Sequence, residues 1–340
     1  RPLPTINVTS EDNTGGTGIK STTVTGLPDF LVYDNATKTI KFKNGVQEVT
    51  KLPDGQDSKT YNVNIQVTDN SNNSSRRQVT ITVKSMTTKY TATANPQKQT
   101  VSYGQTPNTE TSINKNGLPT GTKYTWRTIP NTTTGPGEKT GVVIVTYPDG
   151  STDLVDVTVD VRKLSDEYEP TGTKIVKNQN ATVTNDDLKA AVTISNNGNS
   201  KVKSVTPVGN ISTTNTGTQT INATVTYLDG TTDKVTIPLE VKDVIAPTIQ
   251  TPTEGQLWEI TSLDKTLPPI RVETSDNSGG SGVKSIVPIN LPSFLKFDKA
   301  TNSIVFQDGV REVPKLSGIN RTTRNITLRV EDNAGNSSER

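Results

Sequence analysis

Short runs in which apolar and polar residues alternate recur along the whole chain. Residues 61–67, 79–83, 155–161 and 326–330 alternate Val, Ile, Leu or Tyr with polar residues. This spacing is typical of strands with one buried face. The best helical candidate is the short segment at residues 185–191, which is at most two turns long. The pattern therefore predicts an all-β chain.

The beginning of the chain is repeated in its last third. Residues 4–8 match 268–272, and the glycine-bearing segment 12–21 matches 276–285. The matching positions keep the same order as far as Asp69-Asn70, which corresponds to Asp332-Asn333. So many matching positions in one order indicate a single module used twice.

The middle of the chain contains a second pair of matching segments, residues 141–153 and 221–233. Each segment holds an Asp-Gly pair between two alternating runs, at 149–150 and 229–230, which predicts the tight turn of a β-hairpin. The order of modules is then A, B, B, A. We call residues 1–85 and 244–340 the flanking modules, and residues 86–164 and 165–243 the central modules.

These repeats predict a tandem array of four small all-β modules. Residues 246–267 have no counterpart before Arg1, and the strand at 78–83 has none after Asn333. The sequence opens on Arg1-Pro2 and shows no signal peptide. We therefore expect the chain to be a piece of a longer protein, cut inside a module at both ends.

Composition narrows the chemistry that the chain can perform. It has no cysteine and no histidine, and 36 basic residues nearly balance 34 acidic ones. Thiol nucleophiles, imidazole acid–base chemistry and Ser-His-Asp triads are thus excluded, and the charge balance argues against binding of nucleic acid or anionic membranes. No apolar run reaches the roughly 18 residues of a membrane span. A hydrophobic fraction of 29% is low for one large core, and it is consistent either with disorder or with several thin modules. The alternating pattern excludes disorder and favours thin modules.

The central modules resemble Rib/alpha-like repeats of Gram-positive cell-wall-anchored surface proteins. The residues that carry the resemblance are the Tyr-Pro-Asp-Gly-Ser-Thr-Asp run at 147–153, its copy at 227–233, and residues 118–126. The second central module lacks the Leu-Pro-x-Gly-Thr element and the Trp of 118–126. The flanking modules resemble bacterial cadherin-like or Ig-like modules of serine-rich adhesins, through residues 24–28, residues 33–40 and the closing Asp-Asn-x-x-Asn-Ser-Ser run. Together with the repeats, the resemblances imply an all-β tandem array of four Ig-like or cadherin-like β-sandwich modules in an elongated rod.

Two Asp-Asn loops in each flanking module are the strongest polar constellation. Carboxylate and amide oxygens suit Ca²⁺, which takes about six to eight oxygen ligands, and the cadherin-like resemblance also implies calcium. The alternative is that these residues form ordinary turns and cap their own backbone. The candidate metal ligands are Asp12, Asn13, Asp69, Asn70, Asp276, Asn277, Asp332 and Asn333.

Other candidates point away from catalysis. The loops at 15–18 and 279–282 are glycine-rich, but no Lys-Ser/Thr pair follows and no βαβ unit surrounds them, so mobile turns are favoured over phosphate binding. Trp126 and Trp258 are expected in the cores, with exposed ligand anchors as the alternative. A repeated module argues against a single active site, and we expect no enzyme.

The resemblance and the repeats together imply an extracellular stalk of a bacterial adhesin. Such a stalk projects a binding region from the cell wall, to which a C-terminal region outside this chain anchors it. The alternative is that the modules themselves bind a host matrix protein or a cell-surface glycan, or that they associate between cells. We expect no nucleic-acid partner and no membrane insertion in this segment.

Overall fold

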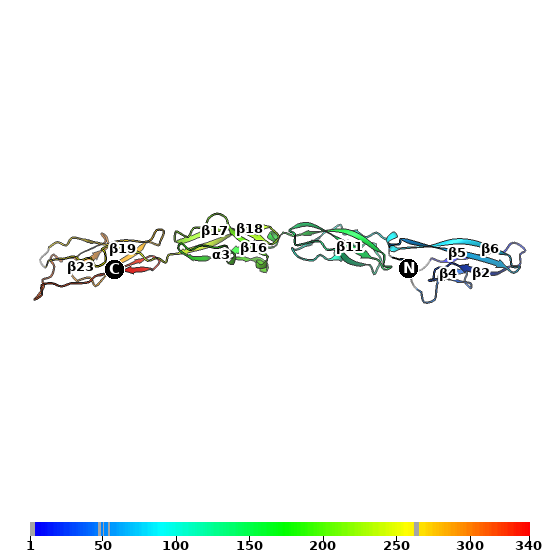
Figure 1. Cartoon of the computed structure of the whole chain (residues 1–340), viewed down its shortest axis with the longest axis horizontal. Coiled ribbons are helices and arrows are strands. Elements are labelled where there is room, and N and C mark those ends of the chain that lie inside the picture. Colours follow the sequence, from blue (N-terminus) through cyan, green and yellow to red (C-terminus); the bar gives the residue numbers. More distant parts are fainter. Residues whose placement is uncertain (1–3, 47–48, 50, 54, 262–264) are drawn as a thin grey trace. The chain divides into compact units, whose positions relative to one another are not determined.

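The computed structural model describes residues 4–46, 49, 51–53, 55–261 and 265–340, and it is nearly all β (Figure 1). The chain divides into two compact units, residues 1–163 and 164–340. Each unit contains one flanking module and one central module, and each module has its own sheets. The architecture is therefore that of tandem Ig-like β-modules, as predicted.

The first flanking module has two three-stranded sheets, ordered β1-β4-β3 and β2-β5-β6. The buried side chains Val8, Phe30, Leu31 and Ile40 form its core. Alternation works here as predicted, because Val63 in β5 is fully buried while both neighbours are exposed. The strands are β1 (Ile6–Asn7), β2 (Ile19–Thr25), β3 (Leu31–Asp34), β4 (Thr39–Phe42), β5 (Ser58–Asp69) and β6 (Ser74–Lys84).

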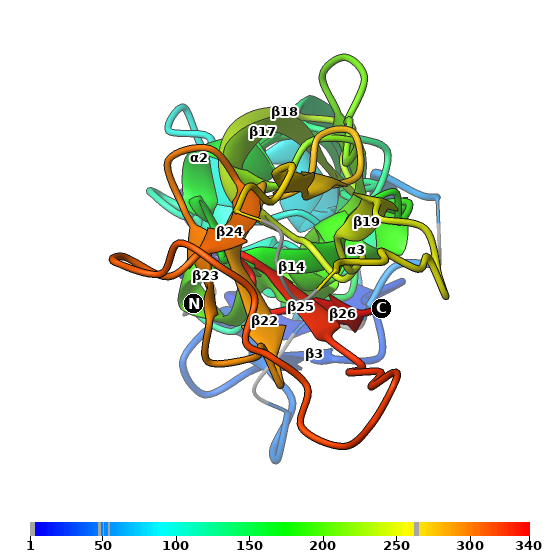
Figure 2. The same cartoon turned by 90° about the vertical axis from the view of Figure 1, so that its left-hand side faces the viewer.

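The second flanking module repeats this topology with sheets β20-β24-β23 and β22-β25-β26, and adds the pair β19-β21. Figure 2 shows β22, β25 and β26 beside one another. Its core includes Ile249, Ile270, Leu328 and Val330. The strands are β19 (Thr248–Thr251), β20 (Ile270–Arg271), β21 (Glu273–Ser275), β22 (Val283–Ile289), β23 (Leu295–Asp298), β24 (Ser303–Phe306), β25 (Thr327–Asp332) and β26 (Ser337–Glu339).

The first central module has a four-stranded sheet, β10-β11-β12-β8, and the pair β7-β9. Its elements are η1 (Met86–Thr88), β7 (Thr93–Ala94), β8 (Gln99–Val101), α1 (Thr109–Ser112), β9 (Ile113–Asn114), β10 (Lys123–Thr128), β11 (Gly137–Thr146) and β12 (Thr152–Val161). Here β8 runs parallel to β12, with Gln99 opposite Val159.

The second central module has the same arrangement, with the sheet β16-β17-β18-β14 and the pair β13-β15. The predicted helical segment forms α3, which a capping box at Thr184 begins. The elements are α2 (Leu164–Glu167), β13 (Pro170–Gly172), β14 (Ile175–Asn178), α3 (Asn185–Ala190), β15 (Val192–Ile194), η2 (Ser195–Lys201), β16 (Val202–Pro207), β17 (Gly217–Tyr227) and β18 (Thr232–Lys242).

The two Asp-Gly pairs form the predicted hairpin turns, since Thr146 pairs with Thr152 and Thr226 with Thr232 around them. Each turn also contacts the short helix that leads into its module. The Met86 N–H donates to Asp149 Oδ2 at 2.7 Å, and the Leu164 N–H donates to Asp229 Oδ2 at 2.8 Å. A carboxylate that accepts the first N–H of a short helix satisfies a donor that the helix itself cannot.

Candidate metal centre

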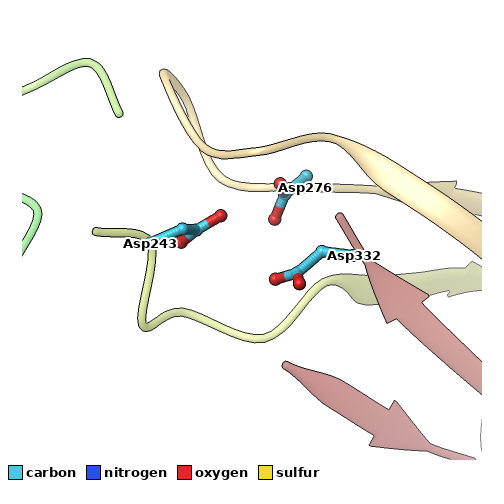
Figure 3. A group of neighbouring side chains, drawn as sticks. All are labelled: Asp243, Asp276 and Asp332. Carbon is cyan, nitrogen blue, oxygen red and sulfur yellow. The ribbon is translucent and has the colours of Figure 1, made fainter. Parts of the chain in front are cut away.

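Three carboxylates converge where the second central module ends and the second flanking module begins. Ligand oxygens of Asp243, Asp276 and Asp332 all lie within 4.8 Å of one another. Figure 3 shows the three side chains pointing toward one another from three segments: the stretch after β18, the loop after β21 and the end of β25. The described residues hold this one group of three side chains with metal-ligand chemistry.

Backbone amides hold each carboxylate in place. Asp276 accepts the N–H groups of Asn277 at 2.9 Å and Gly282 at 2.6 Å. Asp332 accepts the backbone and side-chain N–H groups of Asn336, both at 2.8 Å. Each carboxylate has about four lone-pair sites, so these bonds leave room for a further ligand.

Asp243 is bound in the same way and stays ionised. Its carboxylate accepts the Ser281 N–H at 2.6 Å and the Ile245 N–H at 3.2 Å. Burial raises the pKa of Asp243, but these N–H groups outweigh that effect and the net pKa lies below its ordinary value. Asp243 therefore carries a negative charge at neutral pH, next to two further carboxylates.

The residues present fit a hard cation. Asp332 is fully buried and Asp243 is 8% exposed, and none of the ion pairs within the described ranges includes a member of the group. Asn277 Oδ1 is also buried without a hydrogen-bond partner, next to Asp276 in the chain. Buried carboxylates without a basic partner are costly unless a cation compensates them. An all-oxygen donor set suits Ca²⁺.

The structure thus brings together two of the predicted ligands, Asp276 and Asp332, and adds Asp243. Sequence comparison missed Asp243 because it precedes the segment that the repeat covers. Its position at the end of an alternating strand and just before Ala246-Pro247 is the pattern that could have indicated it.

The matching residues of the first flanking module are held by the same bonds. Asp12 accepts the N–H groups of Asn13 and Gly18, and Asp69 accepts those of Asn73. The described part of this module contributes no third acidic side chain to such a group. A metal role stays a prediction for these residues and for the two remaining asparagines: Asp12, Asn13, Asp69, Asn70 and Asn333.

The structure gives Asn70 and Asn333 a loop-holding role. The Asn70 Nδ2 donates to the carbonyl groups of Thr17 and Gly18 at 2.7 and 3.1 Å. The Asn333 Nδ2 donates to those of Ser281 and Gly282 at 2.9 and 3.0 Å. These side chains tie the glycine-rich loop to the end of β5 or β25, as turn-forming amides do.

The two tryptophans lie in different environments. Trp126 packs against the core of the first central module and donates from Nε1 to the Pro107 carbonyl at 3.2 Å. Trp258 is 40% exposed, and its neighbour Leu257 is 58% exposed. The expectation of a core tryptophan is correct for Trp126 and wrong for Trp258, which lies in a segment without regular structure between β19 and β20.

Comparison with known proteins assigns the central modules. The family model described as "Rib domain" matches residues 87–163 and 165–243. The two central modules are Rib domains. Each Rib domain carries the Tyr-x-Asp-Gly hairpin described above, so the predicted Rib/alpha-like repeats are confirmed.

Two known proteins match parts of this chain. The chain is 30% identical over 194 residues to the C protein alpha-antigen of Streptococcus agalactiae, a match that covers 54% of this chain and 18% of that protein. It is 38% identical to a solved Rib structure from Streptococcus pyogenes, over 22% of this chain and 96% of that one, with a TM-score of 0.21. This chain therefore spans less than a fifth of the curated relative it matches.

A cadherin ectodomain is also similar. The structure of Drosophila N-cadherin EC1-4 is 12% identical, covering 98% of this chain and 92% of that one, with a TM-score of 0.30.

Within the described residues, no helix combines the length and apolar character needed to cross a membrane.

Proposed function

We propose that this chain is a non-catalytic spacer of a Gram-positive cell-surface protein, which holds a binding region away from the cell wall. The observation that carries the proposal is the pair of Rib domains with the same sheet order, flanked by two further modules that share a sheet order of their own. Polar side chains on the outer strand faces keep such modules hydrated and non-adhesive.

A spacer acts through its length, so its sequence should be exchangeable. In cells that display the parent protein, we expect deletion of residues 165–243 to lower adhesion. An unrelated β-sandwich module of similar size at the same place should restore adhesion. If the replacement abolishes adhesion as completely as the deletion does, the Rib domain itself contributes to binding and the spacer proposal fails.

One observation favours a second function, direct binding of a matrix protein or a glycan. Exposed aromatic side chains are enriched at binding hot spots, and Trp258 and Leu257 form an exposed apolar pair. If the flanking module binds a ligand here, Trp258→Ala will abolish saturable binding of the chain to cells or matrix. The matched control is Val287→Ala, since Val287 is an apolar side chain of the same module that is 50% exposed.

We further propose that Asp243, Asp276 and Asp332 hold Ca²⁺, with Asn277 Oδ1 as an additional oxygen ligand. The support is the convergence of three carboxylates without a basic partner in the described part of the chain. The ion would neutralise their mutual repulsion and stabilise the folded second flanking module. Such a site would belong to the stalk and would take no part in catalysis.

Thermal unfolding with and without Ca²⁺ tests this assignment. An ion present at about 100 times its Kd stabilises the folded state by roughly 2.7 kcal/mol. We therefore expect Ca²⁺ to raise the Tm of the second flanking module, EDTA to reverse the shift, and Asp276→Asn to abolish it. Asp12→Asn is the matched control and should leave the shift intact. An EDTA-insensitive Tm would show that these loops are turns only.

A further inference from the structure

The glycine-rich loop of the second flanking module lies against the second Rib domain. The Thr216 N–H donates to the Gly279 carbonyl at 2.8 Å. On its other side, the same loop donates the Ser281 N–H to Asp243. The loop is thus held between the end of the Rib domain and the segment that leaves it.

Gln179 of the Rib domain is the side chain that contacts this loop most fully. It is 6% exposed and directly follows β14. Its Nε2 donates to the Ser278 carbonyl at 3.0 Å and to the Thr214 carbonyl at 2.7 Å, while its Oε1 accepts from Asn277 Nδ2 at 2.6 Å. The nitrogen and the oxygen of this buried amide both form hydrogen bonds with the loop. Such an amide is specific for its partner, because a loop without these groups would leave buried polar atoms unpaired.

Gly279 makes the close approach possible. Its φ is +73°, and a Cβ at this position would lie 2.4 Å from the Thr214 carbonyl oxygen and 2.6 Å from Asn215 Oδ1. The matching glycine of the first flanking module, Gly15, has a φ of +80°, but a Cβ added there would meet no atom within 4 Å. Both glycines therefore have a left-handed backbone, but of the two only Gly279 lies where a side chain would clash with the Rib domain.

The first Rib domain has a different residue at the position of Gln179. Gly104 and Asn180 both have positive φ, and their N–H groups donate to Thr132 and Thr213 respectively. This correspondence places Tyr103 where the second Rib domain has Gln179. Tyr103 packs against Val101, Val159 and Val161 of its own core.

We propose that Gln179 and Gly279 together determine which module can follow the second Rib domain and hold that module in one orientation. The surface around Gln179, Thr214 and Thr216 fits the backbone of an Asn-x-Gly loop, and a side chain at the glycine position would prevent docking. Tyr103 makes the first Rib domain unsuited to the same partner loop. None of these contacts uses an oxygen atom of Asp243, Asp276 or Asp332.

Spin labels test the proposal cleanly, because the chain has no cysteine. Val208 of the Rib domain and Val287 of the flanking module are 61% and 50% exposed, so Val208→Cys with Val287→Cys gives two labelled sites. We expect pulsed electron spin resonance on the full chain to give one narrow distance distribution. Gln179→Tyr introduces the residue that the first Rib domain has at this position, and it should broaden the distance distribution. Gly279→Ala should broaden it as well, whereas Gly15→Ala should leave it narrow.

A folding control accompanies each variant. Gln179→Ala removes the amide without adding a larger side chain to the contact between the Rib domain and the flanking module. Protection of the β22 and β25 amides from hydrogen exchange reports whether the flanking module stays folded. Broadening in Gln179→Ala with these amides still protected supports the proposal. A distribution that stays narrow in Gln179→Ala, Gln179→Tyr and Gly279→Ala overturns it, as does broadening that Gly15→Ala reproduces.

Discussion

The buried tyrosines of the two Asp-Gly hairpins should differ in how much their hydroxyl groups stabilise the fold. Tyr147 donates to Asp153 Oδ2 at 2.6 Å, and Tyr227 donates to Asp233 Oδ2 at 2.9 Å. Burial, followed by the neighbouring carboxylate, raises the pKa of each tyrosine, so both remain neutral donors at physiological pH.

The difference lies in the carboxylate. Asp153 also accepts the Ala92 N–H at 3.0 Å. The corresponding position in the second Rib domain is Pro170. Thr93-Ala94 pairs with Ile113-Asn114 in the register in which Thr171-Gly172 pairs with Val192-Thr193, so Ala92 and Pro170 occupy the same place. Proline has no N–H, and in the described structure Asp233 accepts from Tyr227 alone.

The magnitudes follow from these bonds. Tyr147→Phe also removes a bond to a charged carboxylate, but Asp153 keeps the Ala92 N–H as a donor, so the change should cost about 1.5 kcal/mol, the lower end of the range for such bonds. Tyr227→Phe leaves Asp233 with none and should cost about 2–3 kcal/mol, as for a lost bond to a charged group. Both rings stay buried and keep their contacts with Tyr90 and Tyr168, so the comparison isolates the hydroxyl.

Hydrogen exchange on the full chain measures both effects, and each Rib domain is the control for the other. Amides that exchange through opening of β17 and β18 should exchange roughly 30- to 150-fold faster in Tyr227→Phe, since each 1.4 kcal/mol is a factor of ten. Those of β11 and β12 should exchange roughly tenfold faster in Tyr147→Phe. Equal acceleration in the two variants would refute the argument from Pro170.

Two further predictions concern pH and backbone geometry. A hydrogen bond from Lys177, followed by those from Thr184, lowers the pKa of Asp187 to about 2 from its ordinary 3.8. The ionised Asp187 therefore stabilises the fold fully above pH 3.8, and this stabilisation is lost as the pH falls toward 2. Carboxyl resonances in an NMR titration measure this pKa, and a midpoint at or above 3.8 would contradict the assignment. Gly26→Ala should destabilise the first flanking module far more than Gly45→Ala. Both glycines have positive φ, costing about 1–2 kcal/mol for alanine, but at Gly26 a Cβ would also lie 2.3 Å from the Asn62 carbonyl oxygen. Urea unfolding of the two variants checks the order, and equal midpoints would contradict it.

Sequence patterns predicted what short segments determine locally. The alternation of residues 155–161 places Val155, Val157, Val159 and Val161 in the core. Asp149-Gly150 forms its turn because Gly150 has a positive φ, which residues with a Cβ rarely adopt. Helix α3 was predictable because its capping and its short apolar face lie within one segment.

The candidate metal centre depends on contacts between distant segments, which explains what the sequence left open. Asp243 approaches Asp276 and Asp332 only because β18 ends beside the loop after β21. Gly15 and Gly279 lie in nearly identical local sequences, yet only Gly279 meets a neighbouring domain in the described structure. Local pattern cannot distinguish such positions, because the difference comes from what packs against them.

The parallel pairing of an early strand with the last one has a mechanical consequence for the Rib domains. In the second domain, β14 lies beside β18 from Ile175 opposite Leu239 to Asn178 opposite Lys242. Tension on the two ends of the domain pulls these strands in opposite directions along their length. The hydrogen bonds between them are then loaded together in shear, whereas an antiparallel hairpin can open one bond at a time. Because forced unfolding is governed by the unfolding rate, the short strand β14 has a large influence on how long a stretched Rib domain stays folded.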